Sequence, residues 1–322
     1  MSNNKNALEA FAKTLNAKAF KVVNYPSYIF LCGGQLKTDR DETPSARSVF
    51  RKHLKNTNPS AADRVLLAEE VSGWFSAASV YPNLVELEEH LAGLSSLILL
   101  FVESEGSIAE LGAFSFVPAL REKLTVVIEK RHYDKRSFIY QGPVTFLRQN
   151  DNDSVFSYKW GEICDGEWKF DLGLCNKAVK QLAEHLADKM KKPASNLFRS
   201  ADHGHRMLLI ADLIGLAGAV RKSDLIPFLE GLQLSDFHTD GTTIEQYLFL
   251  LKNLGLIYRD RYGNQDYLFH VQNRANYIAY HQTLEGRVID RSGFRSRFKK
   301  NLPSDRDREK AYKQYKESTG LK

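Results

Sequence analysis

The 322-residue sequence contains only three cysteines, Cys32, Cys164 and Cys175, and no two of them form a C-x-x-C pair. An odd number of scattered cysteines argues against a disulfide framework or a zinc ribbon and favours a reducing, cytoplasmic location. Long apolar runs are also missing. The longest, Leu97–Val102 and Leu208–Val220, fall far short of the roughly 20 residues that a membrane span needs. We therefore expect a soluble cytoplasmic protein with no membrane contact.

The sequence also lacks several motifs that carry chemistry in other proteins. It contains no H-E-x-x-H, no G-x-S-x-G and no G-x-x-x-x-G-K-[ST]. His203 and His205 resemble a metal pair, but no third ligand follows at metal spacing. We therefore predict no metal site and no cofactor.

Positive charge is concentrated near the C-terminus. The formal net charge is +6, and residues 287–322 alone contain 12 Lys/Arg against 5 Asp/Glu. This basic segment is where a polyanion would most readily be contacted. A solvated helical tail that keeps the protein soluble is the alternative interpretation.

The first part of the chain alternates short apolar runs with stretches of helical periodicity. Continuous apolar strands are typical of a parallel sheet buried on both faces, so we predict an α/β, doubly wound, flavodoxin-like fold. Ligands bind such sheets outside the carboxyl ends of the strands. The predicted strands are Tyr28–Leu31, Val65–Ala68, Leu97–Val102 and Leu124–Ile128.

The pattern changes after "KKPASN" at residues 191–196, which we take as a domain boundary. Residues 1–192 form the first predicted domain. Residues 196–286 read as three helices followed by a hairpin, the outline of a mainly helical winged helix-turn-helix domain. Residues 287–322 form the basic tail.

The predicted recognition helix of the second domain is largely apolar and has Lys252 as its single cation. Sequence-specific reading of base edges is therefore poorly supported. Cations of the predicted wing and tail are better placed to hold a phosphate backbone without sequence preference. Contact with a protein partner or with another copy of the chain is an equal alternative. The expected phosphate contacts are Arg259, Arg261, Arg295, Arg297, Lys299 and Lys300.

The stretch "LILLFVESEGSIAELGAFS", residues 97–115, joins a predicted strand end to a helix that contains Glu110. Ser107 and Glu110 match the S-x-x-E capping box, and pattern alone favours a cap. The alternative is a reactive carboxylate in the first helical turn, where the helix dipole favours the ionised form. Such a carboxylate can attack a sugar carbon as a nucleophile.

Three segments, in order, resemble known proteins. Residues 29–34, residues 103–115 and the segment around Lys135–Val144 match motifs of nucleoside 2-deoxyribosyltransferase-like proteins. The match is closest to effectors of bacterial retrons, which pair such a domain with a winged helix. The resemblance assigns the catalytic domain to residues 1–192 and implies that Glu110 is the nucleophile that takes the sugar at C1′.

The simple deoxyribosyltransferases have an aspartate a few residues before this glutamate, where the present sequence has Ser104 and Glu105. Base exchange between deoxynucleosides is therefore in doubt, whereas cleavage of an N-glycosidic bond is not. Strand-end position and resemblance together give a set of expected substrate-binding residues. They are Cys32, Gly33, Gly34, Glu69, Glu103, Ser104, Gly106, Ser107 and Arg136.

Effectors of this class are implied to be anti-phage toxins. Their implied inhibitors are a retron reverse transcriptase and its msDNA, the DNA linked to the msrRNA non-coding RNA. The expected activity is that of an N-glycosidase on an abundant nucleotide, with NAD+ as the substrate and nicotinamide and ADP-ribose as products. The resemblance also implies a homo-oligomer, because such sites often borrow residues from a neighbouring subunit. The competing hypothesis is a non-enzymatic regulator that senses a nucleotide and binds DNA.

Overall fold

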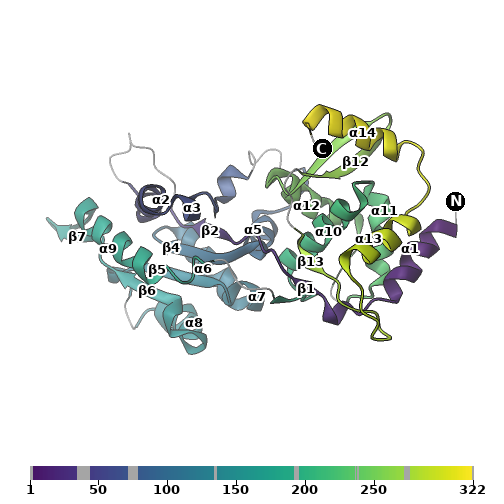
Figure 1. Cartoon of the computed structure of the whole chain (residues 1–322). Helices are drawn as coiled ribbons and strands as arrows, with labels where there is room; N and C mark the ends of the chain where they lie inside the picture. The colour runs from purple at the N-terminus through teal and green to yellow at the C-terminus, as the bar shows by residue number, and fades with distance from the viewer. Residues whose placement is uncertain are drawn as a thin grey trace. The chain divides into compact units, whose positions relative to one another are not determined.

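The computed structural model shows two compact units, each built from separate stretches of the chain (Figure 1). Unit 1 combines Met1–Tyr25, Val71–Glu86 and Ala194–Lys322, whereas unit 2 combines Pro26–Glu70 and Leu87–Pro193. The boundary expected at residues 192–195 lies outside the described residues. The structure describes residues 3–34, 44–71, 79–133, 136–191, 196–235, 237, 239–271 and 276–320.

A five-stranded, all-parallel sheet forms the centre of unit 2 and confirms the predicted α/β class. Its spatial order β3-β2-β4-β5-β6 corresponds to second, first, third, fourth and fifth in the chain, the flavodoxin-like order. The sequence analysis missed the edge strand β6, whose residues are mostly half-buried. The strands are β2 (Tyr28–Cys32), β3 (Val65–Leu66), β4 (Ser95–Val102), β5 (Leu124–Glu129) and β6 (Val155–Tyr158).

Helices pack on both faces of this sheet. Buried residues of α2 (Ala46–Thr57) and α9 (Leu172–His185) share one core with Leu99 and Phe101 of β4. The other face is covered by α6 (Glu105–Phe116), whose Phe114 packs against Phe30 of β2. The shorter helices are α3 (Pro59–Ala62), the part of α5 (Leu84–Gly93) from Leu87 onward, α7 (Pro118–Arg121) and α8 (Thr145–Asn150).

Two irregular features follow the sheet strands in unit 2. The hairpin of β7 (Gly161–Cys164) and β8 (Glu167–Phe170) comes directly after β6. A π-helical turn, Tyr140–Val144, lies within the segment that resembles the third family motif and contains Pro143. Both follow β5 in the chain, so they can contribute residues to a ligand site in addition to those at the predicted strand ends.

Unit 1 contains three helices followed by a hairpin, in the order that the sequence predicts. The β11–β12 hairpin extends to a third strand, β10, in an antiparallel sheet. The assignment of this unit as a winged helix stays a prediction. Its elements are α10 (His203–Ala217), β10 (Ala219–Val220), α11 (Lys222–Gly231), α12 (Gly241–Asn253), β11 (Ile257–Tyr262) and β12 (Gln265–His270).

The chain ends contribute to the core of unit 1. Helix α1 (Asn3–Lys13) packs against α11, where a Cβ on Gly231 would lie 2.5 Å from the carbonyl oxygen of Glu9. Residues 287–322, expected as a tail, fold into α13 (Arg291–Asn301) and α14 (Arg308–Thr319), with Phe294, Phe298 and Tyr315 buried. A small sheet joins β1 (Lys21–Val22), β9 (Asn196–Leu197) and β13 (Ile278–Ala279).

Candidate functional site

The ends of β2 and β4 meet at the position where a doubly wound sheet binds its ligands. Gly33 follows β2 with φ +140°, and a Cβ there would lie 2.8 Å from the carbonyl oxygen of Phe101. Only glycine fits this conformation and this close approach. A Cβ on Gly34 would likewise lie 3.0 Å from the Glu103 side chain. The two glycines therefore hold the strand ends close together.

Glu103, directly after β4, caps the helix that follows β2. Its carboxylate oxygens accept hydrogen bonds from the backbone N–H groups of Ala46 at 2.8 Å and Arg47 at 3.2 Å. Burial raises the pKa of Glu103, and these backbone hydrogen bonds oppose that shift. The side chain of Ser45 caps the same helix by accepting from the N–H of Ser48. Glu103 therefore has a structural role whether or not it touches a ligand.

The cap of α6 differs from the one that pattern alone favours. Ser104 is the N-cap, and a reciprocal capping box links its side chain and backbone to Ser107. The Ser107 hydroxyl oxygen accepts from the N–H of Glu103 at 3.0 Å and of Ser104 at 2.9 Å. The predicted Ser107–Glu110 box is therefore wrong, because the N-cap lies three residues earlier than the S-x-x-E pattern assumes.

Glu110 consequently lies in the second turn of α6, and its carboxyl group caps nothing. Its Oε2 atom is buried and has no hydrogen-bond partner among the described residues. Burial raises the pKa of Glu110 to about 8, the charge of Glu88 raises it further, and Arg47 opposes both. The expectation that the helix dipole holds this group ionised is therefore wrong, since desolvation outweighs a dipole that fades beyond the first turn.

Two further carboxylates and one arginine surround Glu110. Burial also raises the pKa of Glu88, on α5, to about 7, with Glu69 adding to the shift and Arg47 opposing it. Arg47 is buried, donates to the carbonyl of Gly34 at 3.1 Å and pairs with both carboxylate oxygens of Glu69 at 3.0 and 3.1 Å. Among the described residues, the result is an acidic cluster in which Arg47 is the single buried cation, and this charge balance favours a ligand that carries positive charge.

The remaining expected substrate residues occupy different environments. Cys32 is buried, and burial together with the nearby Glu110 raises the pKa of its thiol. Gly106 lies in the exposed first turn of α6, where an added Cβ would meet only the Ser104 hydroxyl at 3.9 Å. Arg136 is exposed on the turn that leads into the π-helical turn. The structure thus brings Cys32 and Glu110 together, whereas Gly106 and Arg136 are at the surface.

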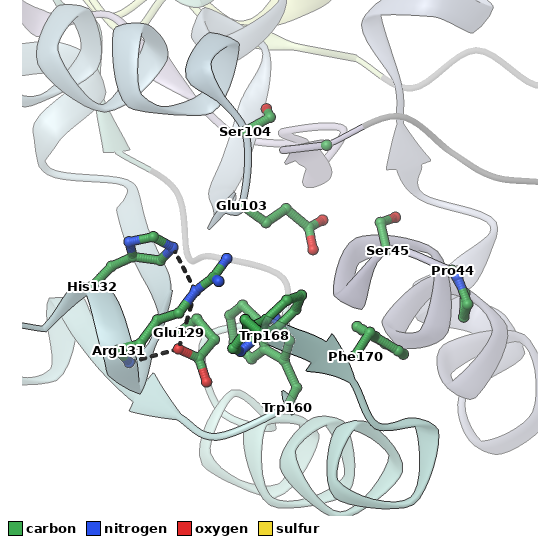
Figure 2. A pocket seen from close by; sticks show the side chains of 11 residues that line it. Pro44, Ser45, Glu103, Ser104, Glu129, Arg131, His132, Trp160, Trp168 and Phe170 are labelled. Carbon is green, nitrogen blue, oxygen red and sulfur yellow. Dashed lines mark hydrogen bonds and ion pairs between the residues drawn. The ribbon is translucent and has the colours of Figure 1, made fainter. Parts of the chain in front are cut away.

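A pocket of about 340 Å³ opens beside this cluster, on the β5 side of the sheet edge (Figure 2). Strand ends supply its polar residues, and the β7–β8 hairpin and the turn before it supply its aromatic wall. Figure 2 shows the Glu103 carboxylate and the Arg131 guanidinium facing the same space. The lining residues are Gly34, Pro44, Ser45, Glu103, Ser104, Glu129, Arg131, His132, Trp160, Trp168 and Phe170.

The expected phosphate contacts fall into two groups in unit 1. Arg259 is engaged, because it pairs with Glu245 and, at 2.9 Å, with Asp266. Arg261 is exposed on β11. The other four cations are exposed on α13, and burial together with Arg295 lowers the pKa of Lys299. The α13 cations, Arg295, Arg297, Lys299 and Lys300, therefore form the more accessible group.

Comparison with known proteins identifies the family of this chain. The family model described as STM3845 retron effector protein matches residues 43–259. The chain belongs to the STM3845 retron effector family. This retron effector is 25% identical over 250 residues to a candidate ribosyltransferase/DNA-binding protein of retron Ec73 from Escherichia coli, covering 73% of each chain. It is 33% identical over 150 residues to the corresponding protein of retron Ec86, also from E. coli, covering 45% of this chain and 46% of that one.

The described part of this retron effector contains neither a cluster of metal ligands nor a membrane-spanning helix. No group of three or more His, Cys, Asp or Glu side chains there is arranged to hold a metal ion. None of its helices in the described ranges is long and apolar enough to cross a membrane.

Proposed function

We propose that this retron effector is an N-glycosidase in which Glu110 is the nucleophile and NAD+ the substrate. The observation that carries the proposal is the buried Oε2 of Glu110, which has no hydrogen-bond partner among the described residues and lies beside two further carboxylates. Leaving a buried carboxyl oxygen unpartnered costs stability, so it is expected to serve a ligand. The names of the two E. coli relatives, which include ribosyltransferase, support the same class of reaction.

The chemistry suits a cationic leaving group. The Glu110 carboxylate forms a bond to C1′ of the ribose, and nicotinamide departs with the electron pair of the glycosidic bond. Because the pyridinium nitrogen is already positive, nicotinamide leaves neutral and needs no proton from a general acid. Water then hydrolyses the ester, which yields ADP-ribose and a proton. The carboxylates of Glu69 and Glu88 stabilise the positive charge that develops on the sugar.

The direct test is to incubate purified protein with NAD+ and measure nicotinamide and ADP-ribose by chromatography. Thymidine and deoxyadenosine serve as alternative substrates in parallel reactions. The proposal predicts release from NAD+ and little or no release of base from the deoxynucleosides. If base is released from the deoxynucleosides only, the protein is still an N-glycosidase, but NAD+ is not its substrate.

We expect the pH dependence of this reaction to report the raised pKa of Glu110. In the free enzyme the carboxyl group is mostly protonated below its pKa of about 8, so kcat/KM should rise with pH and level off above 8. Replacing Glu88 with glutamine removes a like charge, which lowers the pKa of Glu110 and moves the midpoint to lower pH. Initial rates between pH 5.5 and 9.5 measure both profiles.

Glu122→Gln is the matched control for that profile, since this exposed carboxylate follows α7 and does not act on the pKa of Glu110. An unchanged midpoint in Glu88→Gln would reject the electrostatic coupling. A midpoint near the ordinary pKa of glutamate in the wild-type protein would reject the buried, protonated state of Glu110.

We further propose that the retron reverse transcriptase and its msDNA hold the effector inactive in an anti-phage system, and that unit 1 makes the nucleic-acid contact. The exposed α13 cations favour contact with phosphates over sequence-specific recognition. The term DNA-binding in the names of both E. coli relatives supports this role. A regulator without enzymatic activity is the competing function, and the nicotinamide assay separates the two.

Alanine at all four α13 cations is expected to weaken binding to msDNA and to flatten its salt dependence. Because each phosphate contact contributes roughly 0.7–0.9 to the slope of log K against log salt concentration, the loss of four contacts should reduce the magnitude of the slope by roughly 3–4. Fluorescence anisotropy on labelled msDNA at several salt concentrations measures the slope. A variant with alanine at Lys310 and Lys313, which are exposed on α14, is the control. If the slope of the α13 variant is unchanged, the four α13 cations do not contact the msDNA phosphates.

A further inference from the structure

The pocket beside the acidic cluster does not contain Glu110 among its described lining residues. Apart from Ser45 at the start of α2, its polar side chains follow β4 and β5, whereas Glu69 follows β3 on the other side of β2. Adjacent strands lie roughly 4.8 Å apart, so the ends of β3 and β5 are about 14 Å from each other along the sheet edge. The pocket therefore extends from the acidic cluster toward β5 and shares Gly34, Glu103 and Ser104 with the expected substrate-binding residues, whereas the bond-breaking step proposed at Glu110 takes place outside it.

The aromatic wall of the pocket is built around Trp168. The Arg131 guanidinium lies 3.9 Å from the centre of the Trp168 ring. A Cβ on Gly161 would come within 2.4 Å of the same indole, so glycine in the paired strand makes room for it. Trp160, behind this wall, is 2% exposed. The hairpin therefore holds a planar cation against an aromatic ring, an arrangement on which nucleobases stack.

The orientation of Arg131 is fixed by its neighbours. Its Nε–H donates to Nε2 of His132 at 3.0 Å, and its backbone N–H donates to the carboxylate of Glu129 at 2.6 Å. Because Nε2 of His132 accepts this bond, the imidazole is neutral. Figure 2 shows both contacts as dashed lines at the pocket wall. Trp168 covers one face of the Arg131 guanidinium, and the side chain is 43% exposed, which leaves the other face open to a ligand.

The remaining polar groups of the pocket are mainly hydrogen-bond acceptors. Glu129 is 2% exposed, and Glu103 accepts from backbone N–H groups but, as a carboxylate, can accept further bonds. Two carboxylates against one guanidinium disfavour a phosphate in the pocket itself. They favour a flat ring that carries N–H donors. A volume of about 340 Å³ is at the lower end for small-molecule sites and matches one ring system with its sugar.

We propose that this pocket binds the adenine ring of a nucleotide, stacked against the Arg131 guanidinium, with the exocyclic amine donating to Glu103 or Glu129. For a dinucleotide substrate, this is the ring that is not released. That last step rests on the proposed function, whereas adenine binding itself does not. The pocket lies toward β5 along the carboxyl edge of the sheet, and Glu69 of the acidic cluster follows β3. This arrangement suits a ligand with two ring systems joined by a pyrophosphate.

Isothermal titration of the full-length protein with AMP tests the proposal. AMP has no nicotinamide to release, so binding is measured without turnover, in the wild type and in Glu110→Gln. Arg131→Ala is expected to weaken AMP binding at least about five-fold, because base stacking is worth roughly 1–3 kcal/mol. Arg131→Lys keeps the charge but loses the planar surface, so we expect a comparable loss. Inosine monophosphate, which has no exocyclic amine, is expected to bind more weakly than AMP.

Lys169→Ala is the matched control, because Lys169 neighbours Trp168 on β8 but its side chain is 56% exposed and it does not line the pocket. It should bind AMP as the wild type does. Failure of the wild type to bind millimolar AMP would overturn the proposal. Wild-type affinity for AMP in both Arg131 variants, at unchanged melting temperature, would also overturn it. A third outcome is a protein that binds AMP in a way that depends on Arg131 and yet releases no nicotinamide from NAD+. That result would support the adenine-binding pocket and contradict the proposed NAD+ glycosidase activity.

Discussion

Replacing Glu110 with glutamine is expected to reduce nicotinamide release at least about a thousand-fold, because the amide cannot form the bond to C1′. The substitution is close to isosteric and resembles the protonated carboxyl group that predominates at pH 7 when the pKa is about 8. Single-turnover reactions with excess enzyme over NAD+ measure the loss directly. They also separate the chemical step from product release.

The same substitution should leave the fold intact or stabilise it. The pKa of Glu110 is higher in the folded than in the unfolded state, so ionising this group costs folding free energy, and the cost grows as pH rises above the ordinary pKa of glutamate. Glutamine removes that cost, so the melting temperature at pH 8 should equal or exceed that of the wild type. An inactive and unstable Glu110→Gln protein would contradict a purely chemical role.

Glu105→Gln is the matched control for this experiment. Glu105 lies one and a half turns earlier on the same helix and is exposed in its first turn. Its replacement should leave kcat and KM within about two-fold of the wild type, since surface substitutions away from a site have small effects. In cells, expression of the Glu105 variant should stay toxic and expression of the Glu110 variant should not. Toxicity retained by Glu110→Gln would favour a binding mechanism over an enzyme.

The parallel sheet was predictable because burial on both faces demands continuous apolar strands. "LILLFV" and "LTVVI" satisfy that demand, and the structure places them in β4 and β5. The edge strand β6 was not predictable in this way, since its residues after Val155 are only half-buried and carry no apolar run. The sequence pattern therefore predicted the central strands and the β3 edge of the sheet, but not the β6 edge.

The candidate site shows a second limit of pattern reasoning. Spacing alone favoured a cap role for Glu110, but the capping box lies three residues earlier, at Ser104 and Ser107, because the Ser107 hydroxyl serves as the N3 partner of Ser104. Glu88 was missed because it is one of several acids in α5, and only burial distinguishes it. The aromatic segment around Trp160 and Trp168 was visible in the sequence, but its position beside β5 depends on the fold.

Unit 1 illustrates why domain boundaries are harder to predict than elements. Its three central helices and hairpin follow the sequence pattern, but residues 1–25 and 71–86 join the same unit from far away in the chain. Tyr81 donates to the carbonyl of Gln246, and the Gln246 side chain reaches Glu86 at 2.9 Å. No local periodicity encodes contacts between residues about 160 positions apart, so a linear division of the chain could not have found them.

Replacing Asp212 with alanine is expected to destabilise unit 1 by about 3 kcal/mol. The Asp212 side chain is fully buried in α10 and accepts hydrogen bonds from both terminal nitrogens of Arg291, from the N–H of Tyr277 and from the hydroxyl of Tyr280. Removing a buried carboxylate from such a network costs about 3–5 kcal/mol. We expect the lower end, because Arg291 is 28% exposed and water can solvate it in part. Differential scanning calorimetry should show a drop of roughly 6–12 °C in the transition of unit 1.

A double-mutant cycle with Arg291→Ala distinguishes this network from a simple loss of packing. If the ion pair carries the effect, the two substitutions together should cost clearly less than the sum of the single ones. Additivity within about 0.5 kcal/mol would contradict the coupling.

Arg291 is the first residue of α13, so the same substitutions also bear on the proposed nucleic-acid contact. Asp212→Ala leaves every α13 cation in place but releases the helix that presents them. It should therefore weaken binding to msDNA, as the α13 substitutions do, while the slope of its salt dependence changes less than in the four-cation variant.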